Sequence, residues 1–208
     1  MRTRIKICGI TRPLDALAAA AAGVDAIGLI FYRDSPRYVR PEQACEVIRT
    51  VPPFVTVVGV FFDAEDAAVA EVVESVPVDM LQFHGDESPE YCTAWPRPYL
   101  KGIRMRDNTD ILGAAMRFHT ARGLLVDTYA PGSPGGTGEV FDWGRVEGTV
   151  ETPLILAGGL TAENVGAAIE KVRPYAVDVS SGVEIEKGIK DDQKIMRFVQ
   201  AVHQADGT

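Results

Sequence analysis

LILAGGLTAENVGAAIEKVRPYAVDVS, residues 154–180, contains one complete strand–helix–strand pattern. Two short apolar runs, 154–158 and 176–180, flank a segment with a helical pattern over 162–172. Alternation of strands with helices is typical of a parallel sheet, because parallel neighbours need a long crossover connection. This stretch therefore predicts one unit of a parallel sheet covered by helices.

The same alternation continues through the whole chain. Eight strand-like runs begin roughly 20 to 30 residues apart, the length of one strand–helix unit with its turns. The runs are 5–8, 26–31, 55–62, 80–84, 99–104, 124–128, 154–158 and 176–180. The expected helices are 14–22, 41–50, 64–75, 89–95, 109–118, 142–146, 162–172 and 191–204. Eight units in 208 residues predict a single (β/α)8 barrel domain over 1–208.

The main alternative is a doubly wound open sheet. That fold usually has about five or six strands and a G-x-G-x-x-G fingerprint after the first one. The first strand here is followed by CGITRP, residues 8–13, which lacks that spacing. The pattern therefore favours the barrel.

Composition limits the classes of partner. The net charge is −8, whereas nucleic acids and anionic membranes require a basic surface. No apolar run approaches the ~18 residues that span a bilayer, and the first residues do not resemble a signal peptide. Cys8, Cys45 and Cys92 are far apart, without a metal-binding or disulfide pattern. We therefore expect a cytoplasmic protein that acts on a small molecule, either as a monomer or as a homodimer.

Among the side chains at strand ends, where (β/α)8 barrels place their sites, a thiol and a carboxyl are the candidates for proton transfer. Cys8 ends the first strand and Asp127 lies near the end of the sixth. They would face each other across the mouth of the barrel, where a thiol and a carboxyl could act as base and acid. A lone buried cysteine is more often a core residue, so the prediction depends on the partner carboxyl.

A charged pair is expected beneath these groups. Lys6 shares a strand face with Cys8, and Asp178 shares one with Ser180 on the eighth strand, the neighbour of the first. We predict a buried Lys6–Asp178 ion pair, because an unpaired buried charge is costly. The cation would also favour the Cys8 thiolate. The alternative is that Lys6 extends to the rim of the barrel.

Two loops rich in glycine and serine follow the seventh and eighth strands, the usual phosphate position in this fold. Glycine allows backbone amides to approach an anion, and serine adds hydroxyl donors. The residues are Gly158, Gly159, Ser180, Ser181 and Gly182. They predict a phosphate site, with ordinary turn chemistry as the alternative.

Two other segments bear on the site. TYAPGSPGGTGEVFDW, residues 128–143, is rich in glycine and proline and is expected to cover the site, unless it is a surface loop without a role. His84 is the histidine that falls at a strand end. Beside Gln82, a hydrogen-bonded structural role is favoured over a metal ligand, so we expect no metal.

With these residues assembled, the sequence resembles the phosphoribosylanthranilate isomerase family. The matching segments are KICGIT (6–11), SPRYV (35–39), LQFHG (81–85), LLVD (124–127), GGTG (135–138), FDW (141–143), LAGGL (156–160), NV (164–165), DVSSGVE (178–184) and GIKD (188–191). Their order and their placement at strand ends make the resemblance specific. One departure is EKGIKD, 186–191, where the family usually has a proline before the glycine.

The resemblance implies an Amadori rearrangement in tryptophan biosynthesis that needs no cofactor. N-(5-phosphoribosyl)anthranilate would become 1-(2-carboxyphenylamino)-1-deoxyribulose 5-phosphate. Asp127 would protonate the furanose ring oxygen and Cys8 would remove the C2′ proton. Arg37 matches the position that holds the anthranilate carboxylate, although by itself it would be interpreted as a solvated surface arginine.

Three other functions would each require a different set of residues. A metal-dependent sugar-phosphate epimerase would need several His and Asp ligands at strand ends. A histidine-pathway isomerase would lack KICGIT, residues 6–11. A metabolite-binding barrel without catalytic activity would be expected to lack Cys8 or Asp127.

Overall fold

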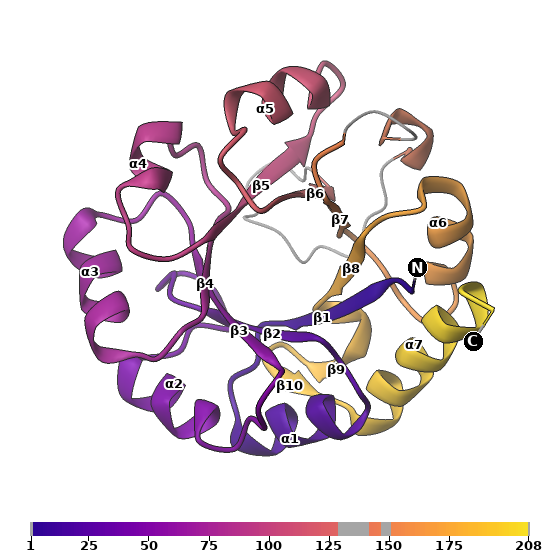
Figure 1. Cartoon of the computed structure of the whole chain (residues 1–208). Helices are drawn as coiled ribbons and strands as arrows, with labels where there is room; N and C mark the ends of the chain where they lie inside the picture. The colour runs from indigo at the N-terminus through magenta and orange to yellow at the C-terminus, as the bar shows by residue number, and fades with distance from the viewer. Residues whose placement is uncertain (1, 129–141, 147–150, 208) are drawn as a thin grey trace.

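Eight parallel strands form a closed barrel with the helices around its outside (Figure 1). The structure is a computed structural model, and it describes residues 2–128, 142–146 and 151–207. Neighbouring strands pair in sequence order, and the ring closes where the first strand pairs with the eighth. The predicted (β/α)8 barrel is confirmed.

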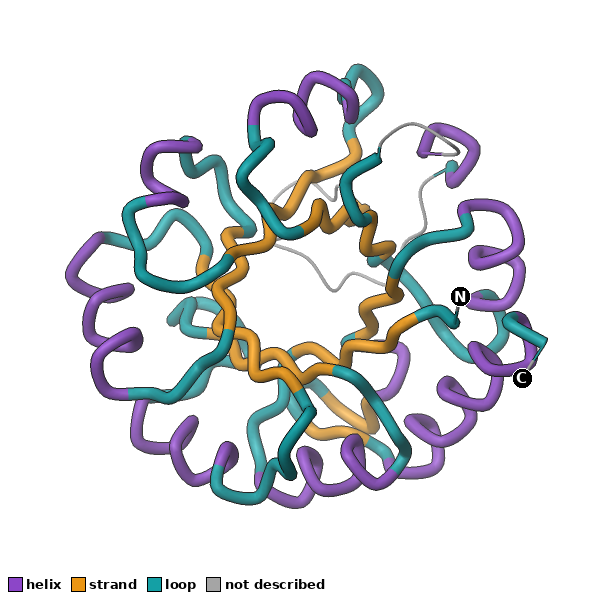
Figure 2. The backbone as a smooth tube through the Cα atoms, in the orientation of Figure 1, coloured by secondary structure: helices purple, strands orange, loops and turns teal. Residues whose placement is uncertain are grey.

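Figure 2 shows the strands as a continuous inner ring and the helices as an outer one. The strands are β1 (Arg4–Cys8), β2 (Ala26–Ile30), β3 (Thr56–Phe61), β4 (Met80–Phe83), β5 (Tyr99–Met105), β6 (Gly123–Thr128), β7 (Leu154–Leu156) and β8 (Ala176–Val179). The helices are α1 (Pro13–Ala21), α2 (Pro41–Ile48), α3 (Asp66–Ser75), α4 (Pro89–Thr93), α5 (Ile111–Arg117), α6 (Val165–Val172) and α7 (Asp192–Ala205).

Four short elements complete the described chain. The segment expected to be a helix at 142–146 contains a 3-10 helix, η1 (Trp143–Val146), and a second one, η2 (Ser181–Val183), follows β8. After η2 comes an antiparallel hairpin of β9 (Glu184–Glu186) and β10 (Ile189–Lys190), which the sequence analysis did not predict. The proposed cover at 128–143 falls mostly in 129–141, outside the described residues.

Local sequence signals explain several helix starts. Proline occupies the first turn of α1, α2 and α4, where its missing N–H costs no hydrogen bond. The Asp191 carboxylate accepts the backbone N–H groups of Gln193 and Lys194 and thereby caps α7. Within the described residues, no helix is both long and apolar enough to cross a membrane.

The large core lies between the strands and the helices, and two smaller apolar clusters lie inside the barrel. Inside the barrel, Leu100, Leu125, Ile155 and Ala176 pack together as an apolar floor. Alternation along the strands then brings polar residues of β1, β4, β6 and β8 to the layer above, toward the carboxyl ends.

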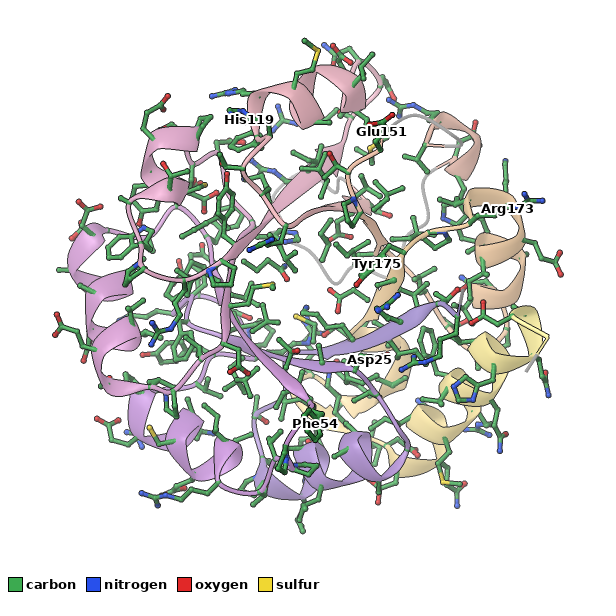
Figure 3. The ribbon with its side chains drawn as sticks, viewed as in Figure 1. Asp25, Phe54, His119, Glu151, Arg173 and Tyr175 are labelled. Atoms are coloured by element: carbon green, nitrogen blue, oxygen red, sulfur yellow. The ribbon has the colours of Figure 1, made fainter. Side chains whose placement is uncertain are left out.

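The loops that lead into the strands lie at the other end of the barrel. Figure 3 labels six residues of these loops. They are Asp25, Phe54, His119, Glu151, Arg173 and Tyr175. The polar layer described above therefore opens on the face opposite to them.

Candidate active site

A cavity of about 340 Å³ opens at the carboxyl ends of the strands, where the sequence analysis expects a site. Cys8, His84, Asp127 and Asp178 line it, from the ends of β1, β4, β6 and β8. Distant parts of the chain therefore bring a thiol, an imidazole and two carboxyls to one cavity.

Lys6 and Asp178 form the predicted buried ion pair. The Lys6 Nζ lies 3.0 Å from Asp178 Oδ1, and the side chains are 5% and 8% exposed. Burial lowers the pKa of Lys6, whereas the charge of Asp178 and the hydrogen bond to it raise this pKa; the net pKa is raised and the ammonium persists. The alternative of a lysine at the rim is therefore wrong.

Cys8 is in contact with this pair. A Cβ at Gly28 would lie 2.9 Å from Cys8 Sγ and 3.1 Å from Lys6 Nζ, so this glycine leaves room for both. Burial raises the pKa of Cys8, Lys6 lowers it and Asp178 raises it, with a net increase. Lys6 does favour the thiolate, as expected, but desolvation outweighs it and the thiol is the resting form.

Asp127 has a partner that the sequence analysis missed. Its Oδ2 lies 3.2 Å from His84 Nε2, and Gln82 Nε2 lies 2.9 Å from His84 Nδ1. An amide donor at Nδ1 places the ring proton on Nε2, from which it is donated to Asp127. His84 is therefore hydrogen-bonded, as expected; its partners are Gln82 and, in addition, the Asp127 carboxyl.

A glycine explains how this imidazole fits. A Cβ at Gly102 on β5 would lie 2.8 Å from His84 Nδ1. The strand thus leaves space for the ring beside its backbone. A glycine inside a predicted strand was the available sequence signal for such a close approach.

Arg37 lines the cavity but is 6% exposed, so it is not a solvated surface arginine. Its Nε and Nη2 donate to the two carboxylate oxygens of Glu184, each at 2.7 Å. Gly9 has φ +74°, and a Cβ there would lie 2.4 Å from Arg37 Cδ. The glycine that follows the cysteine in KICGIT therefore makes room for the arginine.

The two glycine loops lie at the same cavity. Gly158, Gly159, Ser180 and Ser181 line it, and the two glycines have φ values of +87° and +63°. Gly182 is not among the lining residues; a Cβ there would lie 2.0 Å from the Leu160 carbonyl oxygen, so only glycine fits.

The opposite part of the lining is apolar and aromatic. Ile30, Tyr32, Val60, Phe61 and Phe62 contribute to it from β2, β3 and the segments after them. A planar aromatic group could pack there beside Arg37. In the described part of the chain, no cluster of three or more His, Cys, Asp or Glu side chains could hold a metal ion.

The fold and the cavity together define a (β/α)8-barrel enzyme with proton-transfer groups beside glycine- and serine-rich loops. A family model described as N-(5'phosphoribosyl)anthranilate (PRA) isomerase matches residues 5–201. The chain belongs to the phosphoribosylanthranilate isomerase family. This membership decides against the epimerases and histidine-pathway isomerases considered from the sequence.

Individual relatives support the same family membership. The N-(5'-phosphoribosyl)anthranilate isomerase of Pseudomonas fluorescens (strain SBW25) is 56% identical over 204 residues, 98% of this chain and 97% of that protein. The crystal structure of the Thermotoga maritima enzyme has a TM-score of 0.88 at 38% identity, over 99% of this chain and 100% of that one. Another structure shows monomers that were generated from the dimeric Thermotoga maritima enzyme.

A further solved relative contains a ligand. It is a phosphoribosyl anthranilate isomerase in complex with reduced 1-(o-carboxyphenylamino)-1-deoxyribulose 5-phosphate. Its TM-score is 0.84 at 37% identity, and the match covers 99% of this chain and 100% of that one.

Proposed function

We propose that this chain converts N-(5'-phosphoribosyl)anthranilate to 1-(2-carboxyphenylamino)-1-deoxyribulose 5-phosphate by general acid–base catalysis, as a step of tryptophan biosynthesis. Family membership supports the substrate, and a solved relative holds a reduced form of this product. One observation supports the acid–base assignment above all. Cys8 and Asp127, the two protic groups expected from the sequence, line the same cavity.

Asp127 is the general acid in this proposal. Its carboxyl donates a proton to the furanose ring oxygen as the bond from that oxygen to C1′ breaks. The lone pair of the anilino nitrogen forms the C1′=N bond of a protonated Schiff base. His84, which donates to Oδ2, then stabilises the carboxylate that remains.

Cys8 is the general base. Its thiolate takes the proton from C2′, and the electrons of that bond form C1′=C2′ while the iminium nitrogen becomes neutral. The resulting enolamine gains a proton at C1′ and loses one from the 2′-hydroxyl to give the ketone. Because burial raises the pKa of the thiol despite Lys6, the base is the minor form at rest, and activity should rise with pH.

The remaining residues would hold the two ends of the substrate. The loops with Gly158, Gly159, Ser180, Ser181 and Gly182 would bind the phosphate. Arg37 would bind the carboxylate, while the apolar lining packs against the aromatic ring. A local cation overrides the negative net charge of the chain at this point.

The experiment is to follow the fluorescence of the anthranilate group after the purified protein is mixed with N-(5'-phosphoribosyl)anthranilate. We expect enzyme-dependent loss of the substrate signal with formation of the product. A protein that binds the reduced product but leaves the substrate unchanged would instead be a metabolite-binding barrel without this activity.

A further inference from the structure

We infer that Glu184, itself held by Lys190, is a positioning residue for Arg37 and thereby sets the preference of the site for a carboxylated aryl group. The inference rests on the proposed role of Arg37 and extends it to two residues that do not line the cavity. Both come from the short hairpin of β9 and β10 that the sequence analysis did not predict.

The contact between Glu184 and Arg37 fixes the plane of the guanidinium. Two bonds of 2.7 Å join Nε and Nη2 to the two carboxylate oxygens, and the side chains are 4% and 7% exposed. A bidentate pair of this kind restricts rotation as well as position. Because Glu184 uses the Nε–Nη2 edge, the Nη1–Nη2 edge is the one with two parallel N–H groups for a substrate carboxylate.

Glu184 is in turn held by several donors. Besides Arg37, Lys190 Nζ donates to Oε1 at 2.8 Å and the Gly188 backbone N–H donates to it at 3.3 Å. Burial would raise the pKa of Glu184, but the bonds from Arg37 and the charge of Lys190 outweigh it and the pKa is lowered. The carboxylate therefore stays ionised and does not rotate away from the arginine.

Lys190 connects this pair to the catalytic end of the barrel. Its Nζ donates to the Cys8 carbonyl oxygen at 2.6 Å and to the Ser180 carbonyl oxygen at 3.2 Å. The position of Arg37 is thereby tied, through Glu184 and Lys190, to the strand that carries the proposed base and to the proposed phosphate loop.

The charges of Arg37, Glu184 and Lys190 also explain why Arg37 can still attract a substrate carboxylate although it is paired with Glu184. Arg37 and Glu184 alone would sum to zero and would attract a substrate carboxylate only weakly. Burial lowers the pKa of Lys190, although its contact with Glu184 raises it; as an ammonium, Lys190 gives the buried cluster a net charge of one positive unit. A bound carboxylate would neutralise this charge, whereas an aryl group without one would leave it uncompensated.

The test compares two stable ligands by calorimetry. One is reduced 1-(o-carboxyphenylamino)-1-deoxyribulose 5-phosphate, and the other is the same compound without the ring carboxylate. The ratio of their Kd values measures the preference for the carboxylate and does not depend on turnover. For Glu184→Gln we expect this preference to fall about tenfold or more, as is typical when a charge-assisted contact is misplaced.

Matched variants separate positioning from general damage. Arg37→Ala should lose at least as much preference as Glu184→Gln, and the double variant should lose no more than Arg37→Ala. Glu87→Gln is the control, because Glu87 forms an equally buried ion pair with Lys101 at 2.9 Å elsewhere in the barrel. It should keep the preference of the unaltered protein.

Three results would overturn either the inference about Glu184 or the proposed role of Arg37. If Glu184→Gln weakens both ligands equally, Glu184 is merely structural and the inference is overturned. If Arg37→Ala leaves the preference unchanged, the proposed carboxylate role of Arg37 is wrong. That result is distinct from one in which only the role of Glu184 fails. If circular dichroism shows that Glu184→Gln does not fold, Glu184→Asp is measured instead, since it keeps the charge but shortens the reach; an unchanged preference in that variant also overturns the inference.

Discussion

Replacing Lys6 with methionine should make the Cys8 thiol less reactive. Lys6 is the buried cation that hydrogen-bonds the thiol and lowers its pKa. Methionine has a similar length and no charge. Once the cation is gone, Asp178 either repels the thiolate or becomes protonated, and neither change stabilises the thiolate.

The expected size follows from the geometry. Two unit charges about 4 Å apart interact by ~4 kcal/mol at an effective dielectric constant of ~20. Asp178, 3.0 Å from the Lys6 ammonium, offsets part of the attraction between Lys6 and the thiolate. If the net attraction is about half of this value, ~2 kcal/mol, its loss in the variant lowers the thiolate fraction at a fixed pH about 10- to 50-fold.

The assay is the rate of alkylation by iodoacetamide, resolved by mass spectrometry so that Cys8 is followed separately from Cys45 and Cys92. Alkylation of Cys8 should slow by the factor above, and the rise of kcat/KM with pH should move to higher pH. Lys101→Met is the control, because it removes an equally buried lysine from the pair with Glu87. An alkylation rate within about twofold of the unaltered protein, or equal slowing in the control, would refute the reasoning.

Three other variants test separate parts of the site. Cys8→Ala should lower kcat by about 100-fold or more, as expected for a removed general base; an effect of a few-fold would make Cys8 a packing residue. Arg37→Ala should mainly raise KM, by about tenfold or more, and an unchanged KM would argue against carboxylate binding. Glu184→Gln should lower the free energy of unfolding in urea near neutral pH. Because the pKa of Glu184 is lowered in the folded protein, its stabilisation is present above the ordinary glutamate pKa of ~4.3 and is lost as the pH falls further, so the two proteins should converge in acid. A gap that stays constant with pH would exclude this origin.

The repeating alternation of strands and helices was sufficient to predict the barrel. Closure of the ring then made the strand containing Lys6 a neighbour of the strand containing Asp178, and the two-residue period placed both side chains inside. The Lys6–Asp178 ion pair could therefore be predicted from the closed ring of strands and the two-residue alternation of side chains. The positions of Cys8 and Asp127 at strand ends likewise predicted that the two side chains share one cavity.

Contacts between strands that are not neighbours could not be predicted in this way. The bond between His84 and Asp127 joins β4 and β6 across β5, and it depends on the space left by Gly102. Such a contact depends on the tilt and register of the strands, which periodicity does not give.

The hairpin after β8 was missed for a different reason. It places Glu184 and Lys190 on adjacent short strands, and their charges, with that of Arg37, are buried only as a group. In the sequence they resemble ordinary surface charges. The net direction of the Cys8 pKa shift could not be predicted from the sequence either. It depends on whether the increase caused by burial exceeds the decrease caused by Lys6.

The most direct test of the central claim is to compare turnover and binding in Asp127→Asn. Asparagine has nearly the same size and cannot supply the proton that opens the ring. We predict a fall in kcat of about 1000-fold or more, within the range for a lost general acid, with the Kd for the reduced product changed by no more than about threefold. Turnover close to that of the unaltered protein would contradict the assignment of Asp127 as the acid.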